Sequence, residues 1–156
     1  MKSVILTKLA ADFLIQGLSL SRLEGNNASY IGKMGRHEVF LPVAEESYAV
    51  TTGEQVIYLG SAQAGKFRPG DFLMAGSGEL VDRAFQALDE MELRGAVVNL
   101  TTAANGQEVM FNDMGLPERC QNWREQTIPF LCLLPVEPFG PETATQLVTL
   151  VRKVIN

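Results

Sequence analysis

The strongest constraint on the fold is an apolar stripe between residues 79 and 94. Apolar side chains recur there every three or four positions, and charged or amide side chains fill most positions between them. The apolar set is Leu80, Val81, Ala84, Phe85, Leu88 and Met91. This spacing predicts a helix with one face buried against another layer. Ser77 can cap its start, and Arg94 and Gly95 close it.

Strand-length segments lie on both sides of this helix. Two pairs of them flank short hairpin signals, Gly53-Glu54 and Asn105-Gly106. The predicted strands are residues 37–43, 48–52, 55–59, 71–75, 96–102, 107–111 and 128–134. Arg68-Pro69-Gly70-Asp71 reads as a turn that leads into one of them.

Further helices are predicted at both ends of the chain. Apolar spacing from Leu6 to Leu18 indicates the first, Leu116 to Glu125 a short one, and Pro141 opens the last in the position that proline favours. Hairpins rather than crossovers join most strands. We therefore predict one α+β domain over residues 1–156, with a mainly antiparallel sheet of about five to seven strands and three to four helices mostly on one face.

Composition narrows the class of partner. The chain has 156 residues, of which 46% are apolar and 20% charged, which suits a globular domain with a real core. A net charge of −5 argues against nucleic acid as a partner, because phosphate backbones need a basic surface. No stretch approaches the roughly 18 apolar residues that a membrane span needs, so we expect a soluble, cytoplasmic protein.

The segment Gly60 to Lys66 reads Gly-Ser-Ala-Gln-Ala-Gly-Lys and contains most of a phosphate-binding loop. Phe67 stands where a Ser or Thr would hold magnesium. The following turn leads into a strand, whereas a phosphate loop must start a helix. We interpret the segment as a connector within the sheet and the first place to seek a ligand, with Lys66, Arg68 and Asp71 converging on a pocket.

Gly76-Ser77-Gly78 does lie between a predicted strand and a predicted helix, where backbone N–H groups could hold an anion. Val81 breaks the dinucleotide pattern, and Glu79 competes with a bound anion for the helix N-terminus. A well-capped core helix is the favoured interpretation, and Ser77 is kept as a candidate ligand residue.

The segment Ile31-Gly32-Lys33-Met34-Gly35-Arg36-His37-Glu38-Val39 resembles the core motif of KH domains. That resemblance implies a Gly-x-x-Gly loop that clamps single-stranded nucleic acid between two helices. A turn precedes this segment and strand-like residues follow it, which favours a β-turn in a hairpin over the KH interpretation.

The remaining candidate groups are few. His37 is the single histidine, so no His-based metal site is predicted, nor any other metal or cofactor. Cys120 and Cys132 fit no zinc or redox spacing; we expect reduced thiols, with one disulfide as the alternative. We assign no catalytic residue.

The order of elements, the size and the acidity resemble small type III secretion chaperones, which act as dimers, and roadblock-type regulatory domains. These resemblances imply a non-enzymatic protein-binding, adaptor or chaperone-like domain that forms a homodimer, and this is our first hypothesis. The alternative is a protein or enzyme that binds a small anion or nucleotide through the Gly60–Asp71 loop. The third is single-stranded nucleic-acid binding through Gly32–Gly35.

Overall fold

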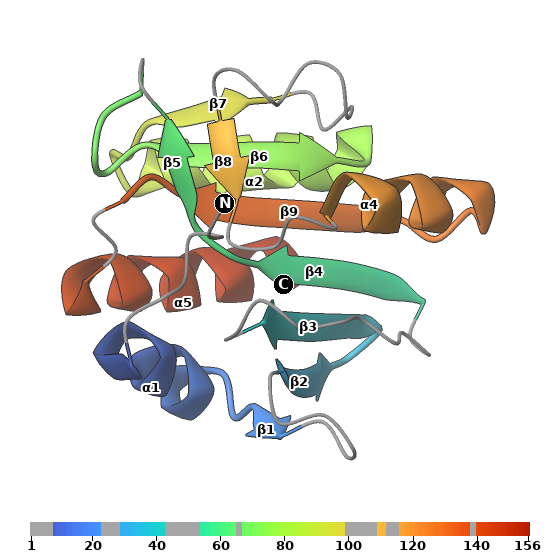
Figure 1. Cartoon of the computed structure of the whole chain (residues 1–156), viewed down its shortest axis with the longest axis horizontal. Coiled ribbons are helices and arrows are strands. Elements are labelled where there is room, and N and C mark those ends of the chain that lie inside the picture. Colours follow the sequence, from blue (N-terminus) through green and yellow to red (C-terminus); the bar gives the residue numbers. More distant parts are fainter. Residues whose placement is uncertain are drawn as a thin grey trace.

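A mixed sheet runs through the centre of the protein (Figure 1). The computed structural model describes residues 8–22, 29–42, 54–64, 67–98, 109–111, 116–137 and 140–156. Within these residues seven strands form a main sheet in the order β1-β2-β3-β4-β9-β6-β7, and two form a small sheet, β5-β8. The main sheet contains β1 (Ser21–Arg22), β2 (Ser29–Met34), β3 (His37–Pro42), β4 (Gln55–Leu59), β6 (Phe72–Gly76), β7 (Gly95–Val97) and β9 (Phe130–Pro135), and the small one β5 (Ala62–Ala64) and β8 (Val109–Phe111).

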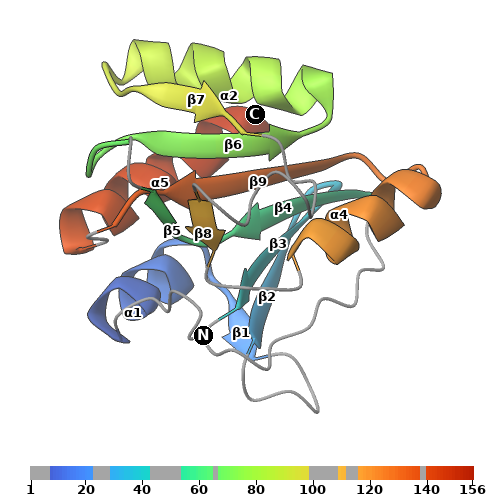
Figure 2. The same cartoon turned by 45° about the horizontal axis from the view of Figure 1, so that its top comes forward.

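Helices cover both faces of the main sheet. α1 (Lys8–Gly17), α2 (Gly78–Glu90) and α5 (Pro141–Ile155) share one hydrophobic core with the sheet, and α4 (Leu116–Glu125) shares a second core on the opposite face. Figures 1 and 2 show α5 passing behind the sheet and α4 in front of it. The predicted one-sided packing therefore holds for three of the four described helices, and α4 is the exception. Among the described residues, no helix has the length and apolar character needed to cross a membrane.

The prediction of a mainly antiparallel sheet is wrong at the centre of the sheet. β3 with β4, β4 with β9, and β6 with β7 pair in parallel, whereas the outer pairs β1–β2 and β2–β3 and the pair β6–β9 are antiparallel. Nearly every side chain of β4 and β9 is buried, and strands buried on both faces are typical of parallel sheets. A hairpin was also predicted at Gly53-Glu54. Its first strand, residues 48–52, lies outside the described residues, and its second strand, β4, pairs in parallel with β3 and β9.

The hairpin predicted around Asn105-Gly106 is also wrong where the structure describes it. β7 pairs in parallel with β6, whereas β8 pairs antiparallel with β5 in the small sheet. Gly95 explains how β7 fits under α2, because a Cβ there would lie only 2.6 Å from Cδ1 of Leu88. The turn at residues 105–106 itself lies outside the described residues.

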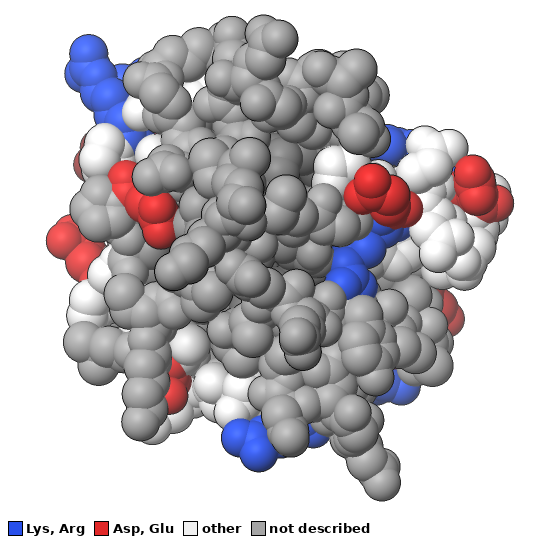
Figure 3. All heavy atoms as spheres, in the orientation of Figure 1, with Lys and Arg blue, Asp and Glu red and all other residues white. Residues whose placement is uncertain are grey.

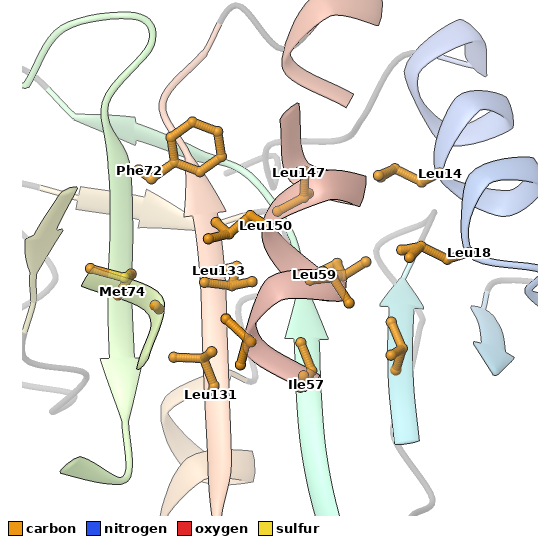
Figure 4. Packing of buried hydrophobic residues seen from close by; sticks show 14 of the residues in the cluster. Leu14, Leu18, Ile57, Leu59, Phe72, Met74, Leu131, Leu133, Leu147 and Leu150 are labelled. Carbon is orange, nitrogen blue, oxygen red and sulfur yellow. The ribbon is translucent and has the colours of Figure 1, made fainter. Parts of the chain in front are cut away.

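Successive side chains of the central strands point to opposite faces of the sheet, so each strand contributes to two separate cores. In β4, Ile57 and Leu59 belong to the core under α5, and Val56 and Tyr58 to the core under α4. Figure 4 shows Ile57 and Leu59 along β4, and Leu150 of α5 next to Leu133 of β9; all four side chains are fully buried. Burying side chains of this size contributes about 1.5–3 kcal/mol each, so both faces of the sheet contribute to the stability of the fold.

The helix predictions are confirmed, with two local differences. α4 has the predicted bounds, and Pro141 occupies the first turn of α5. α2 ends at Glu90 rather than Arg94, because Glu92 has a φ of +59°, which no α-helix accommodates. Ser77 precedes α2, but its side chain makes no capping hydrogen bond.

Gly76 allows β6 to approach β9 closely before the chain enters α2. Its φ is +144°, and a Cβ at this position would collide with the carbonyl oxygen of Phe130. The next residue, Ser77, donates its N–H to that same oxygen over 2.8 Å and accepts the Phe130 N–H at its Oγ over 3.1 Å. The side chain that sequence assigned to capping α2 instead ties the end of β6 to the start of β9.

Candidate functional site

The carboxyl ends of β4 and β9 meet at one edge of the main sheet and stay connected beyond it. Gly60 donates its N–H to the carbonyl of Leu133 over 3.1 Å, and Glu137 donates to the carbonyl of Ala62 over 2.9 Å. Ala62 and Val136 form an isolated parallel bridge. Ligands of α/β sheets bind beyond the carboxyl ends of parallel strands, so this edge is the candidate site. We call it the carboxyl edge: residues 60–62, 136–137 and Asp71.

Asp71 reaches the carboxyl edge from the opposite direction, because β6 runs antiparallel to β9. Its carbonyl accepts the Val136 N–H over 2.9 Å. The side chain is buried, and both of its oxygens have partners. Oδ1 lies 3.5 Å from Nε of Arg94, and Oδ2 accepts the N–H of Arg68 over 3.1 Å. Asp71 therefore holds the Arg68–Asp71 turn and orients an arginine.

Glu137 is the carboxylate at this edge with altered acidity. It lies two residues beyond the end of β9 and is partly buried, and this burial raises the pKa of its carboxyl group above the ordinary value. Desolvation disfavours the charged form, so the protonated acid persists to a higher pH than in a solvated glutamate. A carboxylic acid of this kind can donate a proton to a leaving group.

Ser61 adds a hydroxyl to the same edge. It is fully buried in the segment that carries the chain from β4 in the main sheet to β5 in the small sheet. Figure 1 shows β5 leaving the tip of β4. Residues 60 and 61 connect β4 to β5, and the bridge between Ala62 and Val136 joins the two sheets here, so Ser61 lies between two rigid elements that can hold a binding group precisely.

The structure brings some of the sequence-predicted residues together and separates others. Arg68 and Asp71 share the turn at the carboxyl edge, and Arg68 is exposed. Lys66 lies outside the described residues. Ser77 lies at the other end of β6, about 20 Å from Asp71 at about 3.3 Å per residue, and contacts Phe130. Ser77 and Asp71 therefore belong to opposite edges of the sheet.

Two residues of the carboxyl edge, Ser61 and Glu137, were not predicted as site residues. A sequence signal for Glu137 exists, since it is the first charged residue after the apolar run from Ile128 to Val136. Had that run been assigned to a central parallel strand, its carboxyl end would have been the place to look. Ser61 lies inside the Gly60–Lys66 segment, of which only Lys66 was predicted as a site residue.

The other predicted motifs lie away from this edge. Gly35 has a φ of +64° and, with Arg36, turns the chain between the antiparallel strands β2 and β3, which confirms the predicted hairpin. A KH loop would join two helices. His37 is buried at the start of β3, and burial lowers its pKa, helped by the charges of Arg83 and Arg36. No three His, Cys, Asp or Glu side chains of the described residues cluster as metal ligands.

Charge at the surface is mixed in sign. Figure 3 shows Lys and Arg side chains and Asp and Glu side chains around the rim of one face. Arg36 with Glu54, at 2.8 Å, and Lys153 with Glu90, at 3.1 Å, form ion pairs at the exposed surface. Exposed pairs of this kind contribute little stability. The pairing of Arg94 differs because its acidic partner, Asp71, is buried.

Comparisons with known proteins identify the fold. No protein-family model matches the chain, and no curated protein matches its sequence. Solved structures do match. The nucleosidase MTAN of Helicobacter pylori, a mutant with 5′-methylthioadenosine in the active site, has a TM-score of 0.63 and 9% identity, with 99% of each chain covered.

Two other structures are similar over 99% of both chains. A mutant of futalosine hydrolase from Helicobacter pylori has a TM-score of 0.63 and 7% identity. The 5′-methylthioadenosine/S-adenosylhomocysteine nucleosidase of Neisseria meningitidis, in complex with methylthio-immucillin-A, has a TM-score of 0.60 and 10% identity. The chain thus has the α/β fold of these nucleoside-cleaving enzymes, and identities this low show the fold alone.

These matches overturn the first hypothesis. The prediction of a non-enzymatic adaptor or chaperone-like domain rested on the order of elements, and that order belongs here to a mixed sheet shared with nucleosidases and futalosine hydrolases. Type III secretion chaperones and roadblock domains were therefore the wrong comparison. The small-molecule alternative, which used the Gly60–Asp71 loop, fits the fold better.

Proposed function

We propose that this protein binds a nucleoside at the carboxyl edge and hydrolyses its N-glycosidic bond. The observation that carries this proposal is the position of Glu137, a carboxyl group of raised pKa at the end of a central parallel strand in a nucleosidase fold. The similar proteins act on 5′-methylthioadenosine, S-adenosylhomocysteine or futalosine. We take nucleosides of that kind as the substrate class.

The reaction needs a proton at the departing base. Cleavage of the bond between C1′ and the base nitrogen leaves electrons on the base, and protonation there makes the base a better leaving group. Glu137 in its acid form donates this proton. Water adds to C1′, its surplus proton returns to the Glu137 carboxylate, and the products are the free base and the sugar.

Asp71 has a different role in this proposal. One of its oxygens already accepts the Arg68 N–H and the other faces Arg94, so Asp71 is engaged as a structural acceptor. It positions the turn and the Arg94 guanidinium, which is 70% exposed and can meet a polar group of the substrate. The buried hydroxyl of Ser61 supplies a further hydrogen-bonding group between the two sheets.

The test is release of free base by the purified chain. The protein is incubated separately with 5′-methylthioadenosine, S-adenosylhomocysteine and futalosine, and the base is quantified by liquid chromatography. We expect release from at least one of them, with kcat reduced about 10²- to 10⁴-fold in Glu137→Gln. The matched control is Glu125→Gln, an exposed glutamate at the end of α4, which should keep full activity.

Calorimetric titration of the same nucleosides separates binding from catalysis. Binding without base release would leave a nucleoside-binding protein and refute the hydrolase. Neither binding nor release with any of the three would refute the proposed function altogether. Loss of activity in Glu125→Gln equal to that in Glu137→Gln would remove the assigned role of Glu137.

Three broader predictions accompany this function. The proposed principal partner is a small molecule and not another protein. Self-association into a homodimer stays a prediction, which light scattering tests. A cytoplasmic location is in keeping with a nucleoside substrate and stays a prediction too. We also propose that the chain forms one domain. The central strand β4 lies between β3 and β9, so one sheet joins segments that are distant in sequence.

A further inference from the structure

The two cysteines of the chain meet in the core under α4. Sγ of Cys120, on α4, lies 3.7 Å from Sγ of Cys132, on β9, and both residues are fully buried. Neither cysteine is part of a disulfide bond, so both carry reduced thiols. A distance of 3.7 Å is a contact between sulfur atoms, whereas a disulfide bond is about 2.05 Å long, so a small approach would suffice to join them.

Packing keeps the two sulfur atoms opposite each other. The Trp123 ring on α4 lies 6.2 Å from the Tyr58 ring and 5.3 Å from the Phe130 ring, measured between centroids. The carbonyl of Trp123 also accepts the N–H of Ile128, over 2.9 Å, just before β9 begins. Figures 1 and 2 show α4 beside the start of β9. These contacts hold the helix in one position on the strand.

We propose that Cys120 and Cys132 form a reversible disulfide that links α4 to β9 when the protein meets a peroxide. One thiol attacks the peroxide oxygen, and sulfenic acid and water result. The second thiol then attacks the sulfenic sulfur, so that the S–S bond forms and a second water leaves. The two sulfurs together lose two electrons, and the peroxide gains them. This modification is independent of the proposed nucleoside chemistry.

Burial sets the rate at which the bond forms. A peroxide molecule cannot reach a sulfur with no exposed surface, so α4 must first move away from β9 in a local opening. Once the helix repacks, the second thiol is already in contact with the oxidised one. Formation of the disulfide should therefore outpace further oxidation of Cys120 or Cys132 to sulfinic acid.

The chain is well suited to a direct test. It contains two cysteines, and trypsin cleaves after Arg119 and Arg124, which places Cys120 in peptide 120–124 and Cys132 in peptide 125–152. The folded protein is treated with hydrogen peroxide, its free thiols are alkylated, and the digest is analysed by mass spectrometry without reductant. We expect the two peptides to appear joined, and to separate after treatment with dithiothreitol.

Thermal unfolding gives a second readout. Closing the loop between positions twelve apart should raise Tm by about 5 °C or more, reversed by dithiothreitol. Cys120→Ala and Cys132→Ala are the matched controls, since each keeps one thiol and neither should show a shift that reductant reverses. Dilute urea below the unfolding midpoint should speed the reaction by exposing the thiols.

The result that overturns the proposal is equally clear. If two alkylatable thiols remain after peroxide treatment in dilute urea, while the fully unfolded chain forms the joined peptides, the folded geometry does not favour the bond. Sulfinic acid on either cysteine in the folded protein, without joined peptides, would also overturn it. Joined peptides that come from a covalent dimer of two chains would do the same.

Discussion

The backbone N–H of Glu137 donates to the carbonyl oxygen of Ala62 over 2.9 Å. This bond joins the segment after β9 to the segment after β4, outside the regular ladder of either sheet. The backbone of Glu137, whose side chain we assign to proton donation, is thereby held beside the residues that enter the small sheet. Its position depends on the backbone of residue 62, so side-chain substitutions at Glu137 should leave the local fold intact.

Glu137→Gln should stabilise the fold at neutral pH. Burial raises the pKa of Glu137 above its ordinary value of 4.5, so the folded chain holds this proton more tightly than the unfolded chain. The stabilising contribution of the protonated carboxyl is complete below the unfolded pKa and is lost as pH rises through the folded pKa. Urea unfolding of both proteins from about pH 4 to about pH 8 measures it.

Between pH 4.5 and the raised pKa of the folded chain, the variant should show a flatter dependence on pH, with Glu125→Gln behaving like the parent protein. Parallel curves for the parent and Glu137→Gln would contradict the raised pKa. A gain in stability together with a loss of base release would show that Glu137 is kept for function at the expense of the fold.

His37→Gln should weaken the response of the protein to mild acid. Burial, with smaller contributions from Arg83 and Arg36, lowers the pKa of His37 below 6.5. The unfolded chain therefore takes up this proton first as pH falls. Stability is present above pH 6.5 and is lost as pH falls through the folded pKa, which is opposite in sign to the effect of Glu137.

The free energy of unfolding at about pH 7.5 and about pH 5.5 tests this prediction. The parent protein should lose more stability between the two than His37→Gln does. Glutamine keeps a polar group of similar size without the titration, so equal losses in the two proteins would rule out a neutral, buried His37.

Gly76→Ala should destabilise the fold by about 2–4 kcal/mol. The φ of +144° is strained for any residue with a Cβ, and the added methyl group would collide with the carbonyl of Phe130. The control is Gly78→Ala in the first turn of α2, where a Cβ meets no atom within 4 Å. That variant should be neutral or stabilised by up to about 1 kcal/mol, because alanine favours helix more than glycine.

Equal stability of Gly76→Ala and Gly78→Ala in urea unfolding would contradict the close approach of β6 and β9. The strain should also separate the end of β6 from β9, and faster hydrogen exchange at the Ser77 and Phe130 amides would reveal it.

Asp71→Ala should cost about 1–3 kcal/mol, because the part-buried N–H of Arg68 loses its acceptor and the turn into β6 loosens. Arg94→Ala, which removes the other partner, should cost no more than about 1 kcal/mol, because the arginine side chain is 70% exposed and solvent screens the pair. Chemical unfolding of the two variants distinguishes them. A larger loss in Arg94→Ala would show that the ion pair, rather than the hydrogen bond, holds the turn.

Local patterns predicted the helices and the position of most strands. The apolar stripe around Ala84 and Leu88 has the period of an α-helix. Proline at position 141 is a local signal for the start of a helix. Strand pairing is different in kind. Whether β4 lies beside β9 depends on residues more than seventy positions away, which no local signal encodes.

The candidate site shows the same division. The turn at Arg68–Asp71 was predicted from the sequence because a turn is local, and Ser77 was proposed because it lies between a predicted strand and a predicted helix, where backbone N–H groups could hold an anion. In the structure, Ser77 lies at the opposite end of β6 from Asp71 and contacts Phe130. The acidity of Glu137 arises from its burial beyond β9, and burial is set by the complete fold.

The parallel pairing of β4 with β9 also constrains how the chain can fold. Val56 faces Phe130 across this pair, so the centre of the sheet joins regions far apart along the chain, and such contacts carry a high loop-closure cost. The β2–β3 hairpin can form early, since its contacts are local. The central pair and the carboxyl edge must wait for β9. Folding should therefore finish at the site, and a fragment that ends before Phe130 should retain the hairpin alone.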